Sequence, residues 1–421
     1  MKILIQQARI IDPQSAHHGK VRDILIENGR IGDIGDKLTV STDRRIVHPN
    51  LCISPGWVDI FANFCDPGYE FKETIETGAA AASSGGYTDV FIIPNTKPPL
   101  DTKAQVEYVR QKSLWLVTAV HPIGAITKNL EGKELAEMYD MHTSGAVAFG
   151  DGLKPVQSAG VLLKALQYVK AFDGVIIQIP DDQSIGANGL INEGIISTRL
   201  GLPGKPALSE ELIIARDIKL ARYADSKIHF TGVSSPGSLE YIKRAKDSGL
   251  AVSCSVSPAH LFFSDEDLLQ YDTNLKVYPP LRTKSMATEL RKGVLDGTID
   301  SIATHHLPHE FDSKVLEFEY ARYGMTGLET SYAMLKTVLP ELSEEKCIEL
   351  LSSNARKIFG LSEQRIEKER EACISLFLPD AAWIPDGAGM KSKSRNSPMI
   401  GVGLKGKPLG IINGDKSFFN D

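Results

Sequence analysis

The sequence has few cysteines, and none of them forms a C-x-x-C pair. Its five cysteines, Cys52, Cys65, Cys254, Cys347 and Cys373, are far apart along the chain. An odd number of scattered cysteines fits neither a disulfide framework nor a cysteine zinc site. We therefore expect a protein of the reducing cytoplasm.

The sequence also lacks long apolar runs and clusters of basic residues. No segment reaches the roughly 20 apolar residues that a membrane span needs. The 53 acidic and 47 basic side chains give a net charge of −6, and no run of Lys and Arg is present to hold phosphates. Glycine patterns typical of nucleotide-binding loops are missing as well. We expect neither a membrane anchor nor a nucleic-acid surface.

From about residue 53 onward, short β-branched runs alternate with segments that have apolar residues at helical spacing, such as 156–172. Eight such runs are present, at 53–61, 88–95, 114–124, 145–151, 174–181, 227–235, 250–258 and 299–309. Eight strand–helix alternations predict an α/β fold, a (β/α)8 TIM barrel over residues 53–358.

The two ends of the chain have a different pattern. Residues 1–52 and 359–421 contain short alternating strands that are separated by Gly and Asn turns. This pattern predicts one small β-sandwich domain formed from both termini.

In such a barrel the chemistry takes place at the carboxyl ends of the strands. The polar or unusual residues at those ends are Phe61, Asn63 and Cys65 after the first run, Asn95 after the second, Asp151 after the fourth, Gln178 after the fifth, Gly232 after the sixth, and His305, His306 and His309 after the eighth. Only the eighth run offers a dense cluster of ligand-type side chains.

Several long motifs carry a family resemblance. They include PGWVDIFANFCDPG (55–68), GAVAFGDGLKPV (145–156), NEGIISTRLGLPGKPALSEELIIARDI (192–218) and SKSRNSPMIG (392–401). The sequence resembles the dihydroorotases of the amidohydrolase superfamily over nearly its whole length. This resemblance implies an amidohydrolase-type barrel, a homo-oligomer such as a homodimer, and a place in pyrimidine biosynthesis.

The resemblance fails at the positions where the family binds metal. Family members end the first strand with H-x-H, Leu and Arg, which supply two metal ligands and a guanidinium for the substrate carboxylate. Here Phe61, Asn63 and Cys65 occupy those three functional positions. Phenylalanine has no ligand atom, an asparagine amide is a weak zinc ligand, and cysteine has no positive charge.

Three further ligand positions have changed. Gln178 and Gly232 stand where the family has histidines, and His305 replaces the aspartate that serves as general base. Of the six ligand positions, only the acidic one at Asp151 is retained. With five of six positions substituted, we expect a catalytically inactive homologue, a pseudoenzyme, that has no metal cofactor.

The substrate side of the pocket is partly retained. Asn95 and His309 match family positions, whereas Tyr278 replaces an asparagine and Cys65 the arginine. We expect Phe61 and Phe64 to fill the emptied pocket, because interiors are close-packed. A turn-capping role is expected for Asp151 and a packing role for Cys65.

Three functional hypotheses remain open at this point. The first is an inactive homologue that is a structural partner of aspartate carbamoyltransferase, as some inactive relatives are. The second is an active cyclic-amide hydrolase whose zinc site is rebuilt from Asp151, His305, His306 and His309. The third is an ordinary dihydroorotase whose activity depends on other residues.

Overall fold

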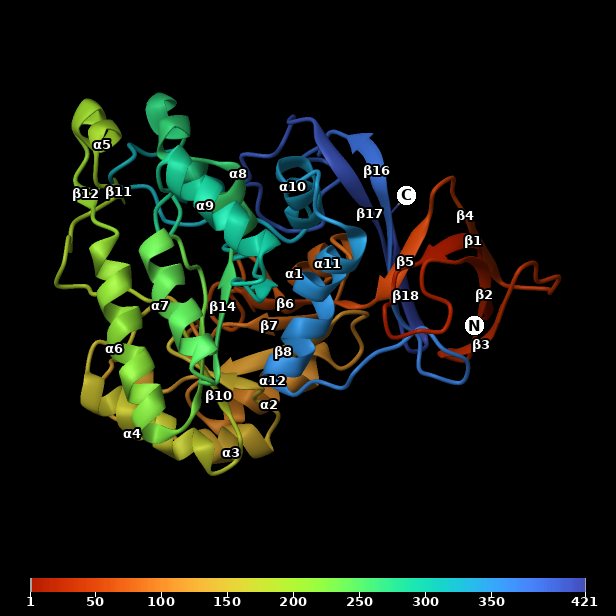
Figure 1. Ribbon diagram of the computed structural model, residues 1–421, viewed down its shortest axis with the longest axis horizontal. Coiled ribbons are helices and arrows are strands. Elements are labelled where there is room, and N and C mark those ends of the chain that lie inside the picture. The colour runs from red at the N-terminus through yellow and green to blue at the C-terminus, as the bar shows by residue number, and fades with distance from the viewer. Residues whose placement is uncertain (1, 421) are drawn as a thin grey trace.

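The computed structural model describes residues 2–420, and its centre is a barrel of eight parallel strands (Figure 1). In sheet order the strands are β6 (Trp57–Ala62), β7 (Tyr87–Ile92), β8 (Ala119–Gly124), β9 (Ala148–Phe149), β10 (Val175–Gln178), β13 (Lys227–Phe230), β14 (Val252–Val256) and β15 (Ser301–Ile302). A bridge between Ala62 and His306 joins the last strand to the first. Every one of the eight expected runs overlaps one of these strands, so the predicted barrel is confirmed.

Helices surround the barrel. The principal ones are α1 (Ile75–Ser84), α2 (Lys103–Ser113), α3 (Met138–Thr143), α4 (Ala159–Lys170), α6 (Leu208–Ala224), α7 (Pro236–Asp247), α9 (Lys284–Leu295) and α10 (Ser331–Val338). In α4 the buried residues Leu162, Ala165, Leu166 and Val169 follow helical spacing. This apolar stripe packs against the barrel, as the sequence pattern predicts.

Additional segments follow the strands and therefore lie at the mouth of the barrel. An arm formed by β11 (Ile191–Asn192), α5 (Ile195–Leu200) and β12 (Gly204–Lys205) follows β10 and projects from the molecule in Figure 1. The mouth also carries α8 (Pro258–Phe262) and the short 3-10 helices η1 (Lys128–Leu130), η2 (Asp265–Gln270), η3 (Thr273–Leu275) and η4 (Phe311–Ser313).

Both ends of the chain contribute to one separate sheet. Its strands are β1 (Lys2–Ile10), β2 (Val21–Glu27), β3 (Arg30–Gly35), β4 (Arg44–Val47), β5 (Cys52–Pro55), β16 (Cys373–Trp383), β17 (Leu404–Asn413) and β18 (Lys416–Phe419). Strand β16 pairs antiparallel with β5, so the C-terminal strands extend the N-terminal ones. Figure 1 shows this sheet at one side of the barrel, which confirms the expected terminal β-domain.

A buried ion pair lies between the barrel and the last helices. These helices are α11 (Glu344–Ile348), the π-helix η5 (Glu349–Ser353) and α12 (Asn354–Phe359). Arg356 of α12 donates to Asp89 at 2.6 Å and to the carbonyl of Gly56 at 3.0 Å. The Arg356 guanidinium keeps the pKa of Asp89 well below its usual value, although burial opposes this. The amino ends of the first two barrel strands are thereby fixed to α12.

Within residues 2–420, no helix is both long enough and apolar enough to cross a membrane.

Candidate functional site

Two aromatic rings meet in the centre of the barrel mouth. Phe61, at the end of β6, lies against the ring of His305 with the centroids 4.6 Å apart and the planes inclined by 30°. His305 Nε2 is 2.9 Å from the hydroxyl of Thr231. Burial lowers the pKa of His305 to about 3, so its imidazole is neutral at physiological pH. The centre is thus filled by an aromatic pair.

Phe64 does not share this role. It is buried on the other side of the backbone, against α1, where a Cβ atom on Gly78 would lie only 2.4 Å from Phe64 Cδ1. The expectation that Phe61 and Phe64 together fill the pocket is therefore wrong for Phe64. Phe61 lies within β6 and points into the barrel, whereas Phe64 lies in the turn after it and packs with the residues of α1.

Gly232 and Gln178, which stand at two of the expected ligand positions, have structural contacts. Gly232 has a φ of +70°, and a Cβ atom there would lie 2.6 Å from Cε1 of His305. The position therefore has no room for a side chain while the His305 ring is in place. Gln178 accepts the backbone N–H of Val156 at 3.2 Å and donates to Asp217 at 2.9 Å. Its amide joins the β10 end to the neighbouring loop and to α6.

Asn63 and Cys65 form a tight turn after β6. The side-chain oxygen of Asn63 accepts the N–H of Cys65 at 2.8 Å, and Cys65 has a φ of +60°. Asparagine often stabilises its own turn in this way. Cys65 is buried, and burial raises the pKa of its thiol to about 12. The thiol is therefore protonated and is not an activated nucleophile.

The side chains of Asp151 and Asn95 form hydrogen bonds with neighbouring loops. Asp151 accepts the N–H groups of Ile126 and Thr127 at 2.9 and 3.0 Å, and its second oxygen accepts the Thr127 hydroxyl. Burial raises the pKa of Asp151 to about 6. Asn95 accepts the N–H of Leu153 at 2.9 Å and donates to the Asp151 carbonyl at 3.3 Å.

The histidines after β15 have separate partners. His306 Nδ1 accepts the N–H of Gly327 at 3.2 Å, so its proton is on Nε2, which faces Glu73 at 3.4 Å. His309 donates from Nε2 to the Tyr323 carbonyl at 2.8 Å and accepts Lys72 on Nδ1 at 3.3 Å. Burial lowers the pKa of His309 to about 4.

These side chains do not fit the metal site that the family resemblance implies. Zinc needs several His, Cys or carboxylate donors that converge on one point. Nowhere in the described part of the chain do three such side chains converge. His305, His306 and His309 are not arranged to share an ion with Asp151, whose two carboxylate oxygens are bound to the loop at Ile126 and Thr127.

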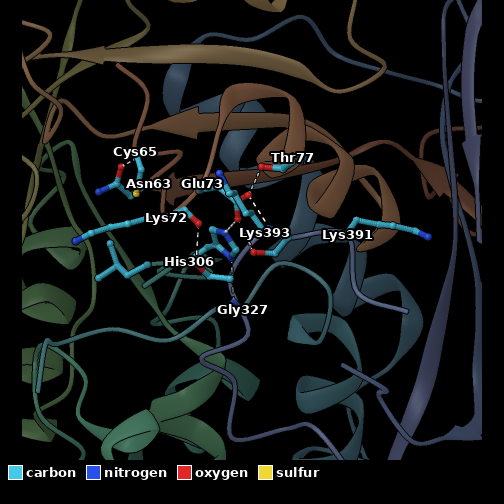
Figure 2. A network of polar contacts seen from close by, with 12 residues as sticks. Asn63, Cys65, Lys72, Glu73, Thr77, His306, Gly327, Lys391 and Lys393 are labelled. Carbon is cyan, nitrogen blue, oxygen red and sulfur yellow. Dashed lines mark hydrogen bonds and ion pairs between the residues drawn. The ribbon is translucent and has the colours of Figure 1, made fainter. Parts of the chain in front are cut away.

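A buried glutamate that the sequence did not reveal holds the C-terminal segment to the mouth. Figure 2 shows Glu73 between α1 and residues 391–393, with His306 beneath it. Its carboxylate accepts the hydroxyls of Thr77 and Ser392 and the N–H of Lys393 at 2.9 Å. Burial raises the pKa of Glu73, but the hydrogen-bond donors around it, namely His306 Nε2 and the hydroxyls of Ser392 and Thr77, bring it below its usual value.

Asn396 makes a second connection of this kind. Its amide donates to the Leu307 carbonyl at 3.0 Å and accepts the His309 N–H at 3.0 Å. Asn396 lies in the motif at 392–401 that carries the family resemblance, but its role and that of Glu73 were not predicted. The only signal in the sequence was this Ser-rich motif, which gives no partner.

Tyr278 lines a cavity at the mouth. Its hydroxyl donates to Asp181 at 2.6 Å, and Asp181 forms a buried ion pair with Lys205 at 2.8 Å. Together with Tyr323 and Leu307 these residues border a cavity of about 500 Å³. Lys205, which lies in the arm, was also missed from the sequence.

The fold is an eight-stranded α/β barrel with a terminal β-domain. L-Hydantoinase (dihydropyrimidinase) from Arthrobacter aurescens superposes on it with a TM-score of 0.85 and 23% identity, covering 99% of this chain and 95% of that chain. A family model described as dihydro-orotase-like matches residues 51–238.

The sequence comparison is more specific. Dihydroorotase of Syntrophus aciditrophicus (strain SB) is 38% identical over 414 residues, 97% of each chain. Dihydroorotase of Pelotomaculum thermopropionicum is 38% identical over 426 residues, covering 100% of this chain and 99% of the relative. The chain belongs to the dihydroorotase family, which confirms the resemblance seen in its motifs.

Proposed function

We propose that this chain is a dihydroorotase homologue that has lost metal-dependent ring opening and acts as a structural partner of aspartate carbamoyltransferase in pyrimidine biosynthesis. One observation carries the first part. At the six ligand positions the side chains are absent, apolar, or bound to neighbouring groups of the protein.

The large contribution that a zinc ion makes to activating water supports this proposal. Zinc lowers the pKa of its bound water from 15.7 to about 7, which corresponds to roughly 10 kcal/mol of nucleophile activation. A general base alone contributes about 10²- to 10⁴-fold. His305 cannot activate water in place of the zinc, because its neutral imidazole packs against Phe61 and is hydrogen-bonded to Thr231.

The second part of the proposal rests on what has been kept. The likeness to dihydroorotases extends over the entire chain, although the substitutions lie at the chemical centre. A scaffold retained without its chemistry is expected where the protein still assembles with a partner. From the family resemblance we expect that partner to be the carbamoyltransferase. We expect both proteins to be cytoplasmic, and this chain to be a homo-oligomer.

The direct test mixes the purified chain with aspartate carbamoyltransferase of the same organism at micromolar concentration. We expect the two proteins to co-elute, and the carbamoyltransferase to assemble differently without this chain. Separate elution with unchanged assembly would contradict the partnership.

Dihydroorotate turnover with added zinc is measured on the same preparation. We expect no turnover. Zinc-dependent turnover that is lost in His305→Ala would instead establish the rebuilt hydrolase site, and turnover that survives this change would point to an ordinary dihydroorotase.

A further inference from the structure

The cavity of about 500 Å³ at the barrel mouth has the size of a small-molecule site. Such sites usually measure roughly 300 to 1,000 Å³. The cavity is lined from the barrel by Leu153, Asp181 and Leu307, which follow β9, β10 and β15. Ala187 and Lys205 line it from the side of the arm. We call this space the mouth cavity.

Two opposite charges line the mouth cavity and neutralise each other. Asp181 and Lys205 form an ion pair at 2.8 Å, and both side chains are 7% exposed. Of the residues between 2 and 420 that line the cavity, only these two are charged. A ligand with a net charge would repel one member of this pair, whereas an uncharged ligand repels neither. The lining therefore favours an uncharged ligand.

The ion pair still has unused hydrogen-bonding capacity. An ammonium group has three N–H donors, and within residues 2–420 the ammonium of Lys205 has Asp181 as its only hydrogen-bond or ion-pair partner. The other oxygen of Asp181 accepts the Tyr278 hydroxyl at 2.6 Å, and each carboxylate oxygen can accept more than one bond. The pair thus offers a donor and an acceptor side by side. A carboxamide is complementary to it, because its carbonyl oxygen accepts and its N–H group donates.

Two tyrosine rings form an aromatic corner of the mouth cavity. The ring centroids of Tyr278 and Tyr323 are 6.0 Å apart, and the ring planes are inclined by 64°. The hydroxyl of Tyr323 donates to the Gly189 carbonyl at 3.2 Å, so both rings are fixed at their outer ends. Both residues are only half-buried, so part of each ring remains available for contact. Aromatic rings pair favourably with a further ring in offset or edge-to-face arrangements.

We propose that the mouth cavity binds an uncharged aromatic carboxamide. The carboxamide oxygen accepts a hydrogen bond from Lys205, and its N–H group donates to Asp181. The ring packs in the corner between Tyr278 and Tyr323. This binding needs no metal, and it does not depend on the proposed partnership with aspartate carbamoyltransferase.

The first test compares benzamide, benzoate and benzamidine, which have nearly the same shape but differ in charge. Each compound is titrated into the full-length chain and followed by ligand-observed NMR. We expect benzamide to bind with a Kd on the order of 1 mM, as is reasonable for so small a ligand. Benzoate and benzamidine should bind at least about tenfold more weakly, because each places a like charge beside Asp181 or Lys205.

The second test locates the bound benzamide. Lys205→Met removes the ammonium donors but keeps a long side chain, and Ala187→Trp narrows the cavity from its exposed rim while both charged residues are kept. We expect each change to weaken the Kd of benzamide at least about tenfold, as for the loss of a charge-assisted hydrogen bond or of the space for the ring. The matched control is Ala382→Trp, at an exposed position of β16 in the terminal sheet, which should leave the Kd unchanged.

Thermal melting of each variant verifies that it is folded. If Lys205→Met does not fold, because Asp181 loses its partner, Ala187→Trp and its control decide the question. No binding of benzamide at about ten times the expected Kd would overturn the proposal. Binding of benzoate or benzamidine as strong as that of benzamide would contradict the uncharged ligand, and an unchanged Kd in the folded Ala187→Trp variant would place the probe outside the cavity. Each of these failures would leave the proposed function intact, because neither the loss of metal chemistry nor the partnership requires this ligand.

Discussion

Two neighbouring regions of the barrel mouth are stabilised in different ways, one by the packing of rings and the other by hydrogen bonds to a buried carboxylate. In the centre, Phe61 lies on His305, and Gly232 leaves room for that ring. Around Glu73, by contrast, a fully buried carboxylate accepts two hydroxyls and a backbone N–H and faces His306. The centre is filled by packed side chains, whereas the region of Glu73 fixes the C-terminal segment to the barrel. Packing and hydrogen bonding therefore stabilise different parts of one mouth.

From this comparison we expect the largest loss of stability when Glu73 is replaced. Glu73→Ala removes a buried acceptor and leaves the groups around it, including Ser392 and His306, without their partner. We expect the free energy of unfolding to fall by about 3 to 5 kcal/mol, because several buried donors lose their acceptor at a cost of about 1 to 3 kcal/mol each. Urea denaturation measures this change.

The control for Glu73 is one helical turn away. Glu76 has a side chain that is 51% exposed and lies 3.7 Å from Lys112. Glu76→Ala should change the free energy of unfolding by less than about 0.5 kcal/mol, as is usual for exposed pairs. Equal effects at the two positions would contradict the view that the Glu73 contacts hold the mouth together.

A second, smaller effect tests the packing of the centre. Gly232→Ala places a methyl group against His305 at a backbone φ of +70°. We expect a loss of about 1 to 3 kcal/mol from strain and overpacking. In a His305→Ala background this contact is absent, so Gly232→Ala should lower the free energy of unfolding by a smaller amount. A double-mutant cycle measures the coupling between the two positions. Strict additivity would mean that Gly232 and His305 do not compete for space.

The buried histidines predict a pH dependence of stability. Burial lowers the pKa values of His305 and His229 to about 3, from 6.5. At a pH between 3 and 6.5, these histidines bind more protons in the unfolded chain than in the folded chain. The free energy of unfolding therefore falls as the pH is lowered from 6.5 toward 3. His305→Phe should lose part of this dependence. Denaturation midpoints at pH 7, 6, 5 and 4 for both proteins measure it, and identical pH profiles would be evidence against a buried neutral imidazole.

The architecture could be predicted well from the sequence, because the residue pattern of a strand is local. Each barrel strand overlaps a β-branched run, and the strands of both termini show alternating apolar and polar residues. The ends of the strands were also placed correctly, since Asn95 and Asp151 follow β7 and β9.

The contacts around the site could not be predicted in the same way. Glu73 and Ser392 are 319 positions apart, and Lys205 meets Asp181 through an arm that projects from the barrel. Such pairings depend on how distant segments dock, and no local periodicity encodes them. The different directions of Phe61 and Phe64 were likewise hidden, because the turn at Asn63 and Cys65 is not visible in the residue pattern.

The central claim is that the barrel mouth no longer holds a catalytic metal, and metal content tests it most directly. The chain is expressed in a host without its own dihydroorotase, purified without chelator, and analysed for zinc while dihydroorotate turnover is followed with zinc added. We predict less than roughly a tenth of an equivalent of zinc and no turnover. About one equivalent or more, accompanied by turnover, would contradict this account.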